Sequence, residues 1–203
     1  MSDTLLKPGR HGAAHGTATG PAGVTVAPAA PSALATLVAG RHRADALADA
    51  LDRRFGVRPP LRPGHATGAG IGFIGVGPGR WLVLGDGADG AAFEAMLREA
   101  AAGLGAVSDQ SDAFLLFDLS GPQVRRALAK GVAVDLHPGV FRIGDAATTP
   151  VGHIGASFWR IDDIGDAPVY RFAVARSYAA SFIDWLLASA AEYGVEVMAA
   201  GRD

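Results

Sequence analysis

The sequence predicts an α+β fold in which one order of elements, β-α-β-β-α-β, occurs twice along the chain. Apolar residues recur at helical spacing in four segments, and short runs typical of β-strands lie between those segments. Turn residues separate the runs, as Gly77-Pro78-Gly79 does between residues 71–76 and 80–84. We therefore expect two fused ferredoxin-like halves, residues 31–110 and 111–203, each with an antiparallel sheet and helices packed on one side.

The first half starts with an apolar run at residues 34–38, its first expected strand. A helix ended by Gly56 follows, with one apolar face made by Ala44, Leu47, Ala48 and Leu51. The Pro-rich segment 57–68 is expected to be a loop, and residues 71–84 a hairpin. A short strand at residues 106–108 follows a second helix, whose apolar positions are Phe93, Met96, Leu97, Ala100 and Leu104.

The second half repeats this order, beginning with an apolar strand at residues 113–119 and a helix capped by Ser120 that runs to Lys130. Residues 131–150 are expected to be irregular, and residues 151–175 a hairpin with its turn at 162–168. A helix with Ser177 as N-cap then precedes Gly194 and an edge strand at 195–198, and its apolar face holds Tyr178, Phe182, Trp185, Leu186, Ser189 and Tyr193. Of these residues, Trp185 is the one whose truncation we expect to harm folding most.

Residues 1–30 are expected to be a flexible N-terminal arm, since Gly, Ala, Pro and Thr dominate them and no apolar run of signal-peptide length occurs. His11 and His15 have helical spacing, but the surrounding glycines argue against a helix and so against a metal site. Such an arm could become ordered on the surface of a partner. No apolar stretch has the length of a membrane span, so we expect a cytoplasmic protein that does not enter a membrane.

The composition argues against several kinds of partner and of chemistry. Eighteen Lys and Arg residues against twenty Asp and Glu residues give a formal charge of −2, which favours neither nucleic acid nor an anionic membrane as a partner. The absence of cysteine excludes disulfides, thiolate zinc sites, iron–sulfur ligation and cysteine nucleophiles.

Glycines at 70, 72 and 75 match the spacing G-x-G-x-x-G, which occurs in dinucleotide-binding loops. A pyrophosphate site needs a helix N-terminus directly after the glycines, whereas here a second strand is expected to follow. Gly70, Gly72 and Gly75 therefore indicate close backbone packing rather than a nucleotide site.

Other polar residues offer no recognisable catalytic or metal-binding pattern. Four histidines are scattered without paired spacing, at His42, His65, His137 and His153, and we expect His153 to be half-buried in a strand. No nucleophile motif accompanies Ser111 or Ser120, and the neighbouring carboxylates are Asp109, Asp112 and Asp118. We expect Asp118 to cap a helix, and a solvated turn to contain Asp162, Asp163 and Asp166. No residue of this chain is assigned to catalysis, to a cofactor or to a metal.

Three segments resemble the gamma subunit of heterotetrameric sarcosine oxidase: GPGRWLV at 77–83, FDLSGPQVRRALAKGVAVDLHPGVFRIGD at 117–145 and VARSYAASFIDWLLASAAEYG at 174–194. The middle segment is the most specific, and the similarity covers most of the chain after about residue 33. The resemblance implies the fold of the folate-binding domain of aminomethyltransferases. It also implies a non-catalytic subunit that contacts the alpha subunit, beside beta and delta subunits.

In that family the partner subunits hold the cofactors FAD, FMN, NAD, tetrahydrofolate and zinc, and none is expected in this chain. The resemblance implies that the assembly demethylates sarcosine oxidatively to glycine, with tetrahydrofolate accepting the methyl carbon. Complexes acting on other N-methylated amino acids stay open as an alternative. A second alternative is a stand-alone folate-binding or aminomethyltransferase-like protein, in which Asp118 or Asp135 would hold the pterin edge. A nucleotide-binding enzyme using residues 70–75 ranks last.

Overall fold

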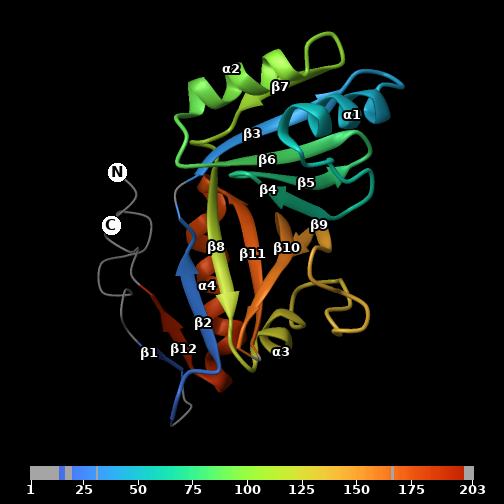
Figure 1. The fold of residues 1–203 in the computed structure, drawn as a ribbon. Coiled ribbons are helices and arrows are strands. Elements are labelled where there is room, and N and C mark those ends of the chain that lie inside the picture. The colour runs from blue at the N-terminus through green and yellow to red at the C-terminus, as the bar shows by residue number, and fades with distance from the viewer. Residues whose placement is uncertain (1–13, 17–19, 31, 166, 199–203) are drawn as a thin grey trace. The chain divides into compact units, whose positions relative to one another are not determined.

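The structure is a computed structural model that describes residues 14–16, 20–30, 32–165 and 167–198 of the 203-residue chain. It divides the chain into two compact units (Figure 1). One unit comprises residues 31–114 and 144–148, and the other comprises residues 1–30, 115–143 and 149–203. The expected α+β class with antiparallel sheets is confirmed.

The unit around residues 31–114 is built on a five-stranded antiparallel sheet of order β4-β5-β6-β3-β7. Its elements in chain order are β3 (Ser32–Ala39), α1 (Ala44–Phe55), β4 (His65–Gly68), β5 (Ile71–Gly77), β6 (Arg80–Asp86), α2 (Gly90–Ala100) and β7 (Gly105–Asp109). Gly56 ends α1 with a φ of 69°, a conformation that glycine adopts without steric cost, which confirms the expected stop.

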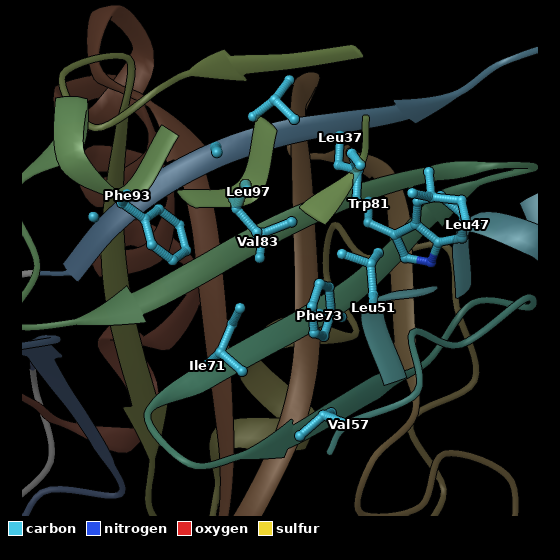
Figure 2. Packing of buried hydrophobic residues seen from close by; sticks show 14 residues of the cluster. Leu37, Leu47, Leu51, Val57, Ile71, Phe73, Trp81, Val83, Phe93 and Leu97 are labelled. Carbon is cyan, nitrogen blue, oxygen red and sulfur yellow. The ribbon is translucent and has the colours of Figure 1, made fainter. Parts of the chain in front are cut away.

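The core of this unit lies between one face of the sheet and the two helices (Figure 2). Leu47 and Leu51 of α1 and Leu97 of α2 are fully buried against strand residues that include Phe73 and Trp81. The Trp81 indole N–H donates to the Pro60 carbonyl at 2.7 Å, which satisfies the polar atom of a side chain that is 1 % exposed.

The segment 57–68, expected to be a loop, contains strand β4. His65 pairs with Ile74 and Gly68 with Ile71, so β4 is the edge of the sheet and forms a hairpin with β5. The expectation was wrong for residues 65–68 because the prolines lie only in the preceding part of the segment and leave His-Ala-Thr-Gly free to pair.

The other unit is built on a seven-stranded sheet of order β1-β12-β2-β8-β11-β10-β9. Strands β1 (Ala14–His15), β2 (Val24–Pro28) and β8 (Phe114–Ser120) come first in the chain, followed by α3 (Val124–Leu128), β9 (Ala146–Val151), β10 (Ile154–Ile164) and β11 (Ala167–Ala175). The 3₁₀ turn η1 (Arg176–Tyr178) leads into α4 (Ala179–Ala190), η2 (Ala191–Tyr193) and β12 (Val195–Val197). Helix α4 lies along the sheet behind β8 and β11 (Figure 1).

Residues 24–28 form strand β2, so the expectation of a flexible arm over residues 1–30 was wrong for this segment. It pairs parallel with β12 and antiparallel with β8, and Val24 and Val26 are 0 % and 1 % exposed. Alternating valines bury one face of this strand, while both of its edges form backbone hydrogen bonds, so residues 24–28 are an interior part of the sheet. His11 lies outside the described residues.

Several expected boundaries in the second half also differ. Strand β9 occupies residues 146–151 of the segment expected to be irregular. Ser120 ends β8 rather than capping α3, whose N-cap is Gln123, and Ser177 lies in η1, so α4 begins at Ala179 without a side-chain cap. Strand β12 pairs with β1 and β2 and is not an edge.

Candidate functional site

The glycine segment 70–75 lies in a β-hairpin. Gly70, with a φ of 77°, is in the turn before β5, whereas Gly72 and Gly75 lie in β5, and the chain continues into β6 rather than into a helix. A nucleotide pyrophosphate would need the backbone N–H groups of a helix N-terminus, so these glycines do not fit that ligand. Close backbone packing is confirmed at Gly75, where a Cβ would lie 2.6 Å from the Arg62 carbonyl oxygen. It is wrong at Gly70, where a Cβ would have nothing within 4 Å, and at Gly72, where the nearest atoms belong to side chains at 3.5 Å or more.

The histidines are spread over both units. His42 lies in a turn with a φ of 59°, His65 is in β4, and His137 is exposed and accepts a hydrogen bond from the Gly139 N–H at 3.2 Å. His153 is exposed in the turn between β9 and β10, so the expectation of a half-buried strand position was wrong. Throughout the described part of the chain, no three His, Asp or Glu side chains come together as metal ligands.

Ser111 and Asp109 form a hydrogen-bonded pair that holds the end of β7. The Ser111 hydroxyl donates to Asp109 Oδ1 at 2.6 Å, and its oxygen accepts from the Leu34 N–H at 3.1 Å. The hydrogen bonds from Ser111 lower the pKa of Asp109. The lowered pKa makes the Asp109 carboxylate a weaker base toward the Ser111 hydroxyl, and the hydrogen bonds of the pair close the turn after β7.

Asp118 and Arg171 form a bidentate ion pair between the adjacent strands β8 and β11. Arg171 Nε and Nη2 each donate at 2.7 Å, to Oδ1 and Oδ2 of Asp118, and the two side chains are 26 % and 23 % exposed. Phe117 stacks on Phe182 of α4, so alternation along β8 places Asp118 on the face away from that helix. The expectation that Asp118 caps a helix was wrong, because its carboxylate is taken by an arginine 53 residues away.

This ion pair bears on the folate alternative. A carboxylate that holds a pterin edge must offer both oxygens to the ligand, and both oxygens of Asp118 already accept from Arg171. The other candidate, Asp135, lies exposed in the loop after α3 and accepts from the His137 N–H at 2.8 Å. Neither carboxylate therefore fits the pterin role in this arrangement.

We expect the Asp118→Asn variant to unfold at lower urea concentration than the parent chain. The amide keeps the shape of the carboxylate, but it carries no charge and its NH2 group cannot accept a hydrogen bond from the Arg171 guanidinium. We expect the free energy of unfolding to fall by about 1–2 kcal/mol, as for a partly exposed ion pair. Glu196→Gln, an exposed strand position, is the matched control. Equal midpoints for Asp118→Asn and the control would show that the pair contributes nothing to stability.

A second arginine, Arg160 of β10, is only 7 % exposed and joins two segments of the chain. Its Nη2 donates to both carboxylate oxygens of Asp163 at 3.0 and 2.9 Å, and its Nη1 donates to the Phe141 carbonyl at 3.0 Å. Tyr170 lies opposite Arg160 on β11. Burial raises the pKa of the Tyr170 hydroxyl, and the guanidinium groups of Arg125 and Arg160 partly oppose that rise.

The helices α3 and α4 are tied together at their ends by Lys130. Its ammonium donates to the Ser189 carbonyl and to Glu192 Oε1, both at 2.5 Å, and lies 4.9 Å from the centre of the Tyr193 ring. The hydrogen bond from Lys130 lowers the pKa of Glu192. These contacts join the end of α3 to the end of α4.

Reasoning from the sequence alone missed Arg160 and Arg171. Both stand inside strands that are otherwise largely apolar, where a charged residue has to find a partner. A charged residue within an apolar strand was therefore the sequence signal that could have predicted an ion pair at these two positions. It also missed the large apolar side chains that the described part of the chain leaves exposed, namely Leu61, Val140, Ile143, Ile164, Tyr178 and Met198.

Within the described residues, every helix is too short or too polar to cross a membrane. The model of the sarcosine oxidase, gamma subunit family matches residues 40–192. No curated protein sequence matches the chain.

Two solved structures are similar to this chain. A chain of the heterotetrameric sarcosine oxidase from Corynebacterium sp. U-96, in complex with pyrrole 2-carboxylate, is 26 % identical with a TM-score of 0.72, and the match covers 91 % of this chain and 90 % of that one. The glycine cleavage system aminomethyltransferase T from Bartonella henselae is 15 % identical with a TM-score of 0.60, over 87 % of this chain and 48 % of that one. The second likeness shows a shared fold.

Proposed function

The chain belongs to the sarcosine oxidase, gamma subunit family, and from this premise we propose that it is the non-catalytic gamma subunit of a heterotetrameric sarcosine oxidase. The observation that carries the proposal is the match to one chain of such an enzyme over nearly the whole length of both chains. The match to the aminomethyltransferase, by contrast, covers about half of the length of that enzyme. This chain therefore has the length of the oxidase chain and not that of the whole aminomethyltransferase.

In the proposed assembly this chain stabilises the complex through contacts with the alpha subunit, and beta and delta subunits complete it. FAD, FMN, NAD, tetrahydrofolate and zinc are bound by those partner subunits. The complex demethylates sarcosine oxidatively to glycine in the cytoplasm, and tetrahydrofolate accepts the methyl carbon. The two electrons removed from sarcosine pass through the flavins to oxygen, which is reduced to hydrogen peroxide. Two observations support a chain without a site of its own: the glycine segment leads into a strand, and Arg171 occupies the Asp118 carboxylate.

Co-expression with the alpha, beta and delta subunits tests this proposal. We expect the chain to elute with the alpha subunit on a sizing column, and sarcosine-dependent hydrogen peroxide formation to require the complex. The same chain purified alone should neither oxidise sarcosine nor retain a flavin. A monomer that ignores the alpha subunit, or turnover by the isolated chain, would refute the proposal.

Titration of the isolated chain with tetrahydrofolate separates the proposal from a stand-alone folate-binding protein. We expect no saturable binding, because neither Asp118 nor Asp135 offers a free carboxylate in a cavity. Saturable binding that Asp118→Asn abolishes would favour the folate-binding protein instead.

A further inference from the structure

Two neighbouring segments of the seven-stranded unit present large apolar side chains to solvent. Val140 and Ile143 in the loop before β9 are 59 % and 53 % exposed, and Ile164 at the tip of the β10–β11 hairpin is 70 % exposed. Exposing such side chains gains nothing for the fold, because the hydrophobic effect favours their removal from water. Exposed apolar side chains on neighbouring segments are typical of surfaces that bind another protein.

A buried side chain holds these two segments together. The Arg160 guanidinium donates to the Phe141 carbonyl from Nη1 and to the Asp163 carboxylate from Nη2, so the loop and the hairpin tip lie on either side of one planar group. The Phe141 ring points inward and stacks on Phe158, with 5.3 Å between ring centroids. Val140, Ile143 and Ile164 are thus presented from an anchored backbone, which lowers the entropy lost when a partner binds.

The charge beside the apolar side chains indicates the chemistry of the partner. Asp163 is neutralised by Arg160, whereas the exposed carboxylate of Asp162 has no ion pair with any residue that the structure describes. A partner that buries Ile164 must therefore place a cation near Asp162 or leave a desolvated charge unpaired.

We propose that Val140, Ile143, Ile164 and Asp162 form a docking surface for a partner subunit that presents an apolar pocket bordered by lysine or arginine. The inference rests on the proposed function, to which it adds the part of this chain that docks. Arg160 acts as a positioning residue, since it fixes both segments without itself being exposed.

Competition during assembly tests the surface. Parent and variant chains with different tags are co-expressed with limiting alpha, beta and delta subunits, and mass spectrometry of the purified complex measures the ratio incorporated. Ile164→Ser should be incorporated at least about tenfold less than the parent chain, because a buried isoleucine contributes that much to association. Asp162→Lys should also be incorporated less, by a factor that shrinks as salt is raised.

Leu61→Ser is the matched control, because Leu61 is an exposed apolar residue of the other unit. It should be incorporated like the parent chain, and circular dichroism of the isolated variants should show unchanged thermal transitions. Equal incorporation of Ile164→Ser and the parent chain would overturn the docking surface while leaving the proposed function standing. Failure of the parent chain itself to assemble would refute the proposed function.

Discussion

Replacing Val26 by aspartate should remove most of the folding stability of the seven-stranded unit. Val26 is 1 % exposed and lies in the interior strand β2, paired with Leu119 of β8 on one side and Val197 of β12 on the other. An unpaired carboxylate there must be desolvated or protonated, at a cost of several kcal/mol. A typical domain is stable by only about 5–15 kcal/mol, so urea unfolding followed by circular dichroism should show most of the stability gone.

Thr25→Asp provides the matched control, because it introduces the same charge in the same strand at a half-buried position on the opposite face. We expect it to lower the free energy of unfolding by much less than Val26→Asp. Truncation gives an independent check: a chain starting at residue 23 keeps β2, and a chain starting at residue 30 lacks it. If both truncated chains melt at the temperature of the full chain, β2 is not an integral strand.

This strand also shows where prediction from the sequence stopped. The helical spacing of residues 44–51 predicts α1, and Gly56 predicts its end. Both predictions succeed because they depend only on residues that are close together in the sequence. Strand β2 has only five residues in a segment rich in Gly, Ala and Pro, so its local signal is weak. Its pairing with β8 and β12 joins residues that are far apart in the chain, and no local pattern contains that information.

For the polar side chains too, local contacts could be predicted from the sequence and distant ones could not. Reasoning from Asp118 and its neighbours favoured a helix cap, which is a local contact, whereas its partner Arg171 is 53 residues away. Alternation along a strand decides which side chains share a face, but the identity of the neighbouring strand decides which charges meet. The match of the family model to residues 40–192 confirms the family resemblance. The sequence alone was enough to see that resemblance, because three segments distributed along the chain carry it.

Gly152→Ala should strongly destabilise the chain for two separable reasons. Gly152 has a φ of 53° in the two-residue turn between β9 and β10, a conformation that costs an alanine about 1–2 kcal/mol. An alanine Cβ would also lie 2.4 Å from Cδ1 of the Trp185 indole, and such overpacking costs about 1–3 kcal/mol more. Thermal or urea unfolding should therefore show a loss of several kcal/mol.

Two further glycines separate these causes. Gly165→Ala, at a φ of 60° with nothing within 4 Å of the new Cβ, isolates the backbone strain. Gly131→Ala, whose Cβ would lie 2.5 Å from Cζ2 of Trp185, isolates the clash with the indole. If the clash is real, Trp185→Leu should recover part of the loss in the Gly131→Ala background, which a double-mutant cycle measures as a coupling energy. Equal losses for Gly152→Ala and Gly165→Ala would instead mean that the indole moves aside at no cost, so that Trp185 does not constrain the turn.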